Sequence, residues 1–412
     1  MKRFYSSYNP LEQKFQILPR AFKADGVQNW LQSIPKLCFC YSFFRLTDLV
    51  NAKVTEARNK MTEKVLKTVC AGVGFVGGAA HVPSFRKAPN SQLYGLLARK
   101  GRDSEKYALE LKEKMARKDD FDLKIYYDWS DVCKDPEVDA VCVATPTPFH
   151  YPMGKEALEG GKHVYLEMPI APKLKDAEEL GKIAEKKGVV LMPILNFRRC
   201  PGYLKAKELV DGGAIGKPIA ITFREFIAAE DLADQWPLSG WAWDKTKSGG
   251  FPDYTLSVWS LDMLQWFFNS PIENMRWTAN YMPIEGIDDF KGYQTVGIMK
   301  FANGVVGTTM LGSTVAKGLD LSRFEIFGNN GKTILIDWIP SKNREVFDVT
   351  LFGKGDDKEN WQVEGPGPKI WGHRQMIEHF VQASLGNEKP EFGYKAAVAA
   401  QKWADKIVTD LM

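Results

Sequence analysis

The sequence predicts an α/β fold whose first part contains a parallel, doubly wound sheet. Short apolar runs alternate with helical segments over residues 64–192, and this alternation is typical of successive βαβ units. The first apolar run leads directly into a glycine-rich turn at residues 72–77. A strand that runs through such a turn into a helix indicates a dinucleotide-binding unit.

The expected elements follow one another in a regular order. Strands are predicted at 64–71, 94–98, 124–127, 139–144, 163–166 and 189–192, and helices at 75–85, 103–117, 153–159 and 173–187. The first helix is expected to stop near Pro83, because proline cannot continue a helical hydrogen-bond ladder. Ligands of doubly wound sheets bind at the carboxyl ends of the strands, where Gly72, Arg99, Thr145 and Glu167 all fall.

The glycine-rich turn reads Gly-Val-Gly-Phe-Val-Gly, a G-x-G-x-x-G pattern that includes Phe75 and Val76. Gly72 would permit the tight turn, and Gly74 would let the backbone approach a pyrophosphate. Gly77 would allow close packing of a helix whose N-terminus faces the negative charge. The alternative is an ordinary strand-to-helix turn, and the flanking strand and helix favour the nucleotide site.

The end of the second predicted strand indicates which nucleotide binds. An NAD site has an acidic residue there, which accepts a hydrogen bond from the ribose 2′-hydroxyl. This chain instead has Arg99, Lys100 and Arg102, and such cations can pair with a 2′-phosphate. We therefore expect NADP(H) as the cofactor, with a solvated basic loop as the alternative.

Composition limits the other classes of function. The chain has 412 residues, of which 44% are hydrophobic, so it can bury two cores. Its net charge of +4 comes from 55 basic and 51 acidic residues, a balance that argues against nucleic acid as a partner. No apolar run is long enough for a membrane span.

The cysteines and histidines offer little further chemistry. Six cysteines lack C-x-x-C spacing, which indicates a reducing compartment, and Cys70 and Cys142 are expected to be small core residues. The five histidines are scattered without the spacing of a metal motif, so we expect no metal.

Four later segments, with the glycine-rich turn, resemble the Gfo/Idh/MocA oxidoreductases. They are the T-P-x-x-x-H-like residues 145–150, the G-K-H-V-x-x-E-like residues 161–167, and residues 196–199 and 205–218, which resemble the start of that family's second domain. The resemblance spans roughly residues 64–412. It implies a Rossmann domain at 64–195 and an α+β domain at 196–390 with an open, mostly antiparallel sheet. That sheet would form the substrate wall and often the subunit interface. A C-terminal helix at 391–412 would pack back on the Rossmann domain.

The resemblance also implies site residues. Those expected at the cofactor are Thr145, Thr147, His150, Glu167, Met168 and Asn196, and Arg199 is a candidate for binding an anionic substrate.

Three positions depart from the family pattern. Met168 stands where the family has the lysine of Glu-Lys-Pro, the proton-relay group beside the nicotinamide. Aligning residues 249–262 without a gap places Thr255 and Trp259 at the family's Asp and His. A thioether, a threonine and an indole cannot act as acid or base at neutral pH. Asp253 and Tyr254 are titratable substitutes, although they would precede a helix over 257–262 and could point away.

Two functions follow. One is an NADP(H)-binding, catalytically degenerate protein with a regulatory, scaffold or assembly role. The other is an active oxidoreductase on a small polyol, sugar or cyclic carbonyl compound that uses other acid/base groups, since the cofactor itself carries the hydride chemistry. Either could bind a small-molecule substrate or effector.

Residues 1–63 lie outside the resemblance. They contain an aromatic patch at 34–44 and a predicted helix that begins after Thr47. We expect an ordered arm through which the chain forms a homo-oligomer or joins a larger assembly. The basic, hydroxylated start of the chain also resembles an organelle transit segment, so the expected compartment is the cytoplasm or the mitochondrial matrix.

Overall fold

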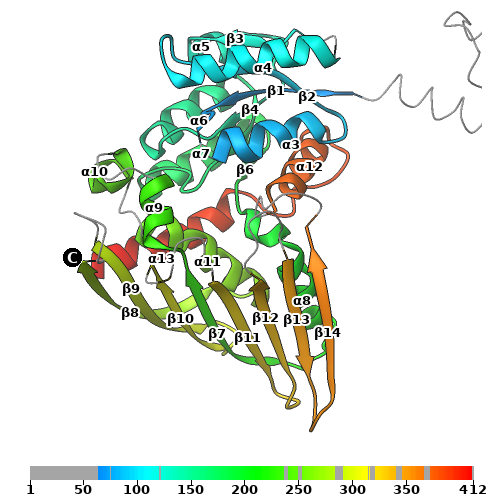
Figure 1. The fold of residues 1–412 in the computed structure, drawn as a ribbon, viewed down its shortest axis with the longest axis vertical. Coiled ribbons are helices and arrows are strands. Elements are labelled where there is room, and N and C mark those ends of the chain that lie inside the picture. The colour runs from blue at the N-terminus through cyan, green and yellow to red at the C-terminus, as the bar shows by residue number, and fades with distance from the viewer. Residues whose placement is uncertain are drawn as a thin grey trace, which may run out of the picture. The chain divides into compact units, whose positions relative to one another are not determined.

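The chain divides into two units, residues 1–63 and 64–412. The computed structural model describes residues 64–74, 76–119, 122–235, 240–248, 253–283, 291–313, 315, 321–339, 346–365 and 372–410. The predicted arm, its aromatic patch and Phe75 therefore lie outside the described residues. All that follows concerns the second unit, drawn in colour in Figure 1.

The first sheet confirms the predicted Rossmann architecture. Its six parallel strands have the order β3-β2-β1-β4-β5-β6. Their bounds are β1 Leu66–Ala71, β2 Ser91–Leu97, β3 Lys124–Tyr126, β4 Ala140–Val143, β5 His163–Leu166 and β6 Leu191–Pro193. The order reverses between β1 and β4, which is where doubly wound sheets bind ligands. Cys70 and Cys142 lie opposite each other on these two strands and are fully buried, as expected of core residues.

Helices connect these strands and cover the sheet. They are the π-helical turn η2 Gly77–His81, α3 Val82–Lys87, α4 Asp103–Asp119, α5 Trp129–Lys134, the 3-10 turn η3 Thr147–Phe149, α6 His150–Glu159 and α7 Leu174–Lys187. The amphipathic α7 buries Leu180 and Ala184 and ends at Gly188, whose φ of 67° is the left-handed cap that glycine favours.

The expectation that the first helix stops near Pro83 was wrong. The helix continues to Lys87, with Pro83 in the first turn of α3 directly after the π-helical turn η2. The Val82 N–H donates to the Gly77 carbonyl, five residues back. A proline in a first turn loses no needed donor, so the change of helical pitch accommodates it.

The second domain is built on an eight-stranded sheet. The strand order is β14-β13-β12-β11-β7-β10-β9-β8, antiparallel except for the parallel pair β7 and β10. The bounds are β7 Pro218–Phe226, β8 Ile272–Pro283, β9 Lys291–Phe301, β10 Val306–Gly312, β11 Leu321–Gly328, β12 Thr333–Ile339, β13 Val346–Phe352 and β14 Lys358–Glu364. This is the open, mostly antiparallel sheet that the sequence led us to expect.

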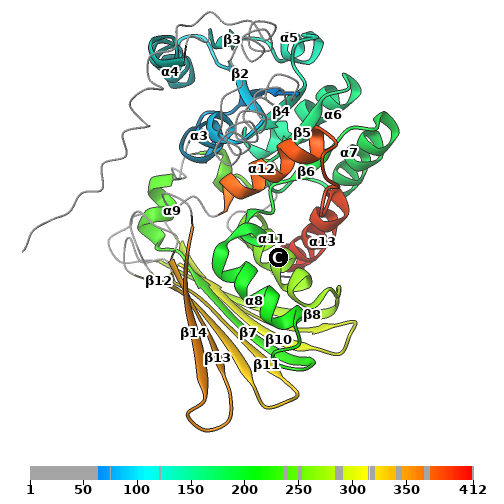
Figure 2. The same cartoon turned by 90° about the vertical axis from the view of Figure 1, so that its right-hand side faces the viewer.

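The helices of the second domain are η4 Asn196–Arg199, α8 Pro201–Asp211, α9 Ala229–Gln235, η5 Trp241–Trp243, α10 Lys245–Ser248 and α11 Asp253–Phe268. Of these, α8 and α11 lie on one face of the sheet (Figure 2). Tyr203 of α8 anchors the core, since its ring lies 5.1 Å from both Phe324 and Phe347 and its hydroxyl lies 2.8 Å from Ser322 Oγ. Close approach requires Gly202, whose Cβ would lie 2.3 Å from the Phe347 ring.

Two C-terminal helices, α12 His373–Ser384 and α13 Tyr394–Asp410, complete the chain. The buried Gln401 of α13 accepts from the Ile170 N–H at 3.1 Å and donates to the Ala171 carbonyl at 3.0 Å. Tyr394 packs against Gly181 of α7, where a Cβ would lie 2.2 Å from the ring. No helix among the described residues combines the length and apolar character that crossing a bilayer requires.

Candidate functional site

The three motif glycines are needed for different physical reasons. Gly72 has a φ of +91°, and a Cβ there would lie 2.2 Å from the Ala144 carbonyl oxygen. A Cβ on Gly77 would lie 1.8 Å from the Gly72 oxygen. Gly74 differs, because a Cβ there meets no atom within 4 Å in the described part of the chain. The fold itself therefore dictates Gly72 and Gly77, whereas at Gly74 the backbone is open to an approaching ligand.

Three strand ends bring the expected site residues to one edge of the sheet. The Ala144 N–H donates to the Ala71 carbonyl at 2.8 Å, and the Glu167 N–H donates to the Val143 carbonyl at 3.0 Å. The backbone of Thr145 lies against Gly72, whose Cβ would lie 2.8 Å from the Thr145 nitrogen. Parallel strand ends thus place the glycine turn, Thr145 and Glu167 together, as the sequence order predicted.

The cationic loop follows β2 at the same edge of the sheet. Arg99, Lys100 and Arg102 are exposed, and in the described part of the chain neither arginine has a carboxylate partner. Lys100 Nζ lies 5.1 Å from the centre of the Tyr127 ring. Glu105 folds back onto the loop and accepts from the Gly101 N–H at 2.7 Å, which lowers the pKa of the carboxyl. The loop can therefore present the guanidinium groups of Arg99 and Arg102 to a ligand, with the Glu105 carboxylate close by.

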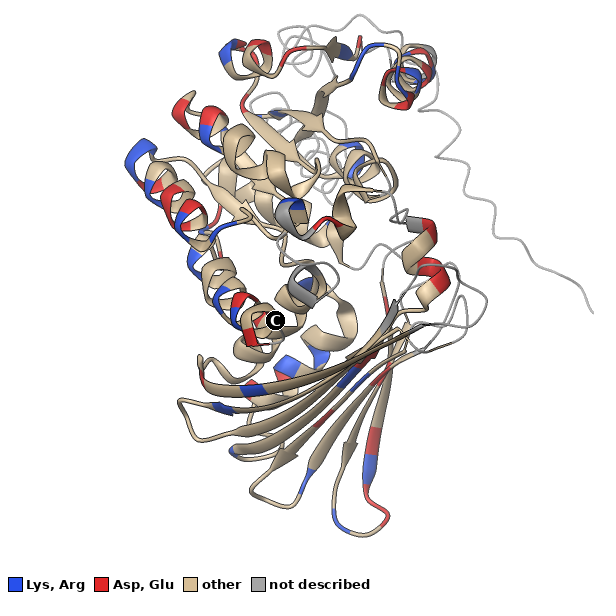
Figure 3. Cartoon of the chain, turned by 90° about the vertical axis from the view of Figure 1, so that its left-hand side faces the viewer, with Lys and Arg blue, Asp and Glu red and all other residues tan. Residues whose placement is uncertain are grey.

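Basic and acidic residues are interspersed along the helices in the ribbon of Figure 3. This distribution agrees with the near balance of 55 basic and 51 acidic residues.

His150 holds two parts of the site together from inside the protein. It is 2% exposed, with Nδ1 2.7 Å from the Pro169 carbonyl oxygen and Nε2 2.6 Å from the Thr145 carbonyl oxygen. Burial lowers the pKa of His150, and the two carbonyls oppose that shift. Thr147 beside it is equally buried. His150 therefore positions the Thr145 segment, and the buried side chains of both residues have little access to a ligand.

Met168 is buried at the end of β5, with 3% of its surface exposed. Its N–H donates to Oε2 of Glu167 at 3.1 Å, and the peptide bond to Pro169 is cis. Glu167 also bonds through Oε1 to His81 Nε2 at 2.7 Å. The titratable groups at this position are therefore the carboxylate and the imidazole, while the thioether has no proton to transfer.

Helix α11 supplies the other substituted positions. Trp259 donates its indole N–H to the Ile194 carbonyl at 2.9 Å, just beyond β6. The helix begins at Asp253, so our expectation that Asp253 and Tyr254 would precede it was wrong. They lie with Thr255 in its first turn, and the side chains of these three residues lie outside the described part of the structure.

The turn η4 contains Asn196, 3% exposed, and two arginines with different surroundings. Arg199, the candidate substrate residue, donates to Glu391 at 2.6 Å. Arg198 forms a buried bidentate pair with Asp262 at 2.7 and 2.6 Å. Burial raises the pKa of Asp262, although Arg198 opposes this. We missed the Arg198–Asp262 pair from sequence, although the adjacent arginines were visible.

Another arrangement missed from sequence joins His81, Glu167 and His373. One potential ligand atom from each lies within 4.8 Å of those of the other two. The His81 and His373 rings meet edge to face, with centroids 4.8 Å apart. Burial, with His81 as a second cause, holds the pKa of His373 well below 6.5. Spacing along the chain could not indicate this cluster, because its members come from η2, from the residue after β5 and from α12.

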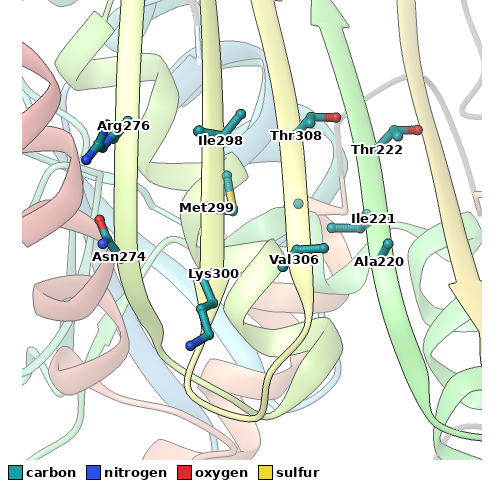
Figure 4. A pocket seen from close by; sticks show the side chains of 11 residues that line it. Ala220, Ile221, Thr222, Asn274, Arg276, Ile298, Met299, Lys300, Val306 and Thr308 are labelled. Carbon is teal, nitrogen blue, oxygen red and sulfur yellow. The ribbon is translucent and has the colours of Figure 1, made fainter.

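A separate depression of about 440 Å³ lies on the sheet of the second domain (Figure 4). It is lined by residues of β7 to β10, with Ile298 and Val306 as exposed apolar groups and Arg276 and Lys300 as cations. It contains no residue of the glycine turn, so it is distinct from the expected nucleotide site.

Comparison with known proteins identifies the family. Residues 66–195 match the oxidoreductase family with an NAD-binding Rossmann fold, Gfo/Idh/MocA, and residues 207–410 match the C-terminal α/β domain of the same family. The chain belongs to the Gfo/Idh/MocA family of NAD(P)-binding oxidoreductases.

Its relatives include two named dehydrogenases. Levoglucosan dehydrogenase of Pseudarthrobacter phenanthrenivorans is 23% identical over 327 residues, which cover 68% of this chain and 82% of that protein. Myo-inositol 2-dehydrogenase of Thermotoga maritima is 26% identical over 265 residues, 63% and 73% of the two chains.

Solved structures share the fold. Levoglucosan dehydrogenase in complex with NADH and levoglucosan superposes with a TM-score of 0.66 at 21% identity, covering 84% of this chain and 97% of that one. Biliverdin reductase of Synechocystis, in complex with biliverdin and NADP+, gives 0.64 at 19% identity, covering 84% and 99%. At this identity the likeness concerns the fold alone.

Proposed function

We propose that this chain binds NADP(H) and has lost the family's proton-relay chemistry, so that it serves a regulatory, scaffold or assembly role. The environment of Met168 is the observation that supports the loss of proton-relay chemistry. This residue lies buried at the site edge with a side chain that cannot accept or donate a proton. Trp259 cannot replace it, because an indole is only a donor and this one is bonded to a carbonyl.

Nucleotide binding is supported by the glycine turn and the cationic loop. The open space at Gly74 suits a pyrophosphate, and the exposed guanidinium groups of Arg99 and Arg102 suit a 2′-phosphate. Fluorescence titration of the purified chain should therefore give a lower Kd for NADPH than for NADH. Arg99→Asp should weaken NADPH at least tenfold and leave NADH nearly unchanged. Equal affinities of the wild-type chain for the two nucleotides would contradict the NADP assignment.

Turnover assays on the cofactor-saturated chain test whether the proton-relay chemistry has been lost. The wild-type chain, saturated with NADP+ or NADPH, should show no change in nicotinamide absorbance with a panel of polyols, sugars and cyclic carbonyl compounds. Met168→Lys should not restore turnover, because Thr255 and Trp259 remain. Met168→Leu, which keeps the apolar volume, is the control for folding and nucleotide binding. Robust wild-type turnover would refute the degenerate assignment.

An active oxidoreductase is the second candidate, and the Glu167–His81 pair favours it. The carboxylate is 12% exposed at the site edge and hydrogen-bonded to a buried imidazole, so this pair could relay a proton in place of a lysine. If turnover is found, Glu167→Gln should abolish it while NADPH binding is retained. Unchanged turnover in Glu167→Gln would exclude this pair as the relay.

A further inference from the structure

We propose that His81, Glu167 and His373 bind a divalent transition-metal ion, with Zn²⁺ as the best match. Two imidazoles and one carboxylate are a common zinc ligand set, with a fourth position left for water. The inference concerns binding alone and does not depend on whether the chain turns over a substrate.

The spacing of the three groups suits one shared ion. The ligand atoms of tetrahedral zinc lie about 3.4 Å from one another. In this cluster the distance between His81 Nε2 and Glu167 Oε1 is 2.7 Å, and the potential ligand atoms all lie within 4.8 Å of one another. Two imidazoles on one such ion would have ring centroids about 5 Å apart. The observed separation of the His81 and His373 centroids is 4.8 Å. Small rotations of the side chains would therefore complete the site.

The chemistry of the groups also suits a cation. His373 is buried, and burial depresses its pKa, so its ring is neutral and has a lone pair to donate. Glu167 supplies negative charge, which partly neutralises an ion in a buried site. Its second oxygen accepts from the Met168 N–H at 3.1 Å, a contact of the kind that orients a ligand from outside the metal's own sphere.

His81 supplies an independent reason to expect a further group here. Its side chain is fully buried, yet Nδ1 has no hydrogen-bond partner among the described residues. Buried polar atoms without partners are rare and commonly mark a missing water or ion.

The proposed site would connect distant parts of the chain. His81 follows the glycine turn in η2, Glu167 comes directly after β5, and His373 begins α12. A bound ion would therefore tie α12 to the nucleotide-binding sheet, and stability should rise with its concentration according to its affinity.

The test uses the full-length, untagged chain after removal of metal with EDTA. Calorimetric titration with Zn²⁺ should show one equivalent bound, and Co²⁺ should give the visible spectrum of a tetrahedral nitrogen and oxygen site. His373→Gln and His81→Gln should each weaken Zn²⁺ at least tenfold. His379→Gln is the matched control, because His379 lies on the same helix, is 9% exposed and pairs instead with Glu388.

The outcomes are separable from misfolding and from loss of the proposed function. Circular dichroism and NADPH titration of each metal-free variant show whether it folds. If His81→Gln does not fold, Glu167→Gln and His373→Gln carry the test. Failure of the wild-type chain to bind Zn²⁺, or equal affinities in His373→Gln and His379→Gln, would overturn the proposal and leave a hydrogen-bonded His81–Glu167 pair packed against the His373 ring.

Discussion

Alanine at Gly74 and alanine at Gly77 should have opposite effects on stability, and alanine at Gly74 should in addition weaken nucleotide binding. At Gly74 an added Cβ meets no atom within 4 Å in the described structure, and the φ there is not positive. Replacing such a glycine restricts the unfolded chain and stabilises by about 0.4–1 kcal/mol. Gly74→Ala should therefore melt at or slightly above the wild-type temperature.

Gly77→Ala is expected to damage the fold. Its Cβ would lie 1.8 Å from the Gly72 oxygen and 2.9 Å from the Gly72 carbonyl carbon. Backbone atoms cannot rotate away as a side chain can, so the turn must open. Overpacking costs typically about 1–3 kcal/mol, and a clash with backbone should fall at or above the upper end. A melting temperature lower by several degrees is expected.

Nucleotide titration completes the comparison. In Gly74→Ala the new methyl group occupies the space through which the backbone would approach the pyrophosphate, so affinity for NADPH should fall at least tenfold, which corresponds to about 1.4 kcal/mol. The measurements are thermal melting without ligand and fluorescence titration with NADPH. Wild-type NADPH affinity in a well-folded Gly74→Ala would refute the placement of the pyrophosphate at this turn.

Four further outcomes follow from the structure. In metal-free protein the pKa of His373 is depressed, so the imidazole of the unfolded chain takes up a proton at a higher pH than that of the folded chain. The stabilisation should therefore be complete above about pH 6.5 and decline below it. Melting curves at pH 7 and 5 should show a smaller decline in His373→Gln. Asp262→Ala leaves the buried Arg198 guanidinium unpaired and should cost about 3–5 kcal/mol in urea unfolding. Gly181→Ala places a Cβ 2.2 Å from the Tyr394 ring and should cost about 1–3 kcal/mol. Gly188→Ala tests backbone strain alone, because its Cβ would meet no described atom within 4 Å but its φ is positive. Deleting residues 1–45 should lower the melting temperature or change the native mass, and an unchanged value of both would show that this segment is no ordered arm.

The Rossmann sheet was predictable because each of its elements carries its own local signal. Strands such as β1 and β4 are short buried apolar runs between helical segments, and parallel order then follows from the alternation. The second sheet was expected only through the family resemblance. Its strands alternate in burial, as in the pattern from Leu321 to Gly328, but alternation alone does not reveal the strand order.

The errors were local and have physical causes. Proline breaks a continuous α-helix, yet the wider π-helical turn before Pro83 removes the need for its missing donor. The start of α11 at Asp253 was missed because a helix was expected only over residues 257–262. The cluster of His81, Glu167 and His373 had no local signal at all, since long-range packing alone brings its members together.

The glycine turn by itself is weaker support for a nucleotide than its pattern suggests. A chain with no use for a nucleotide would still need Gly72 and Gly77, because their Cβ atoms would collide with the chain's own backbone. Only Gly74 lacks such a reason, so its identity is the part of the motif that indicates a ligand. Proton relay depends instead on single side chains, and replacing a lysine by a buried methionine leaves the backbone geometry intact. Binding and chemistry can therefore be lost separately, which is why nucleotide affinity and turnover must be measured on the same preparation before either role is assigned.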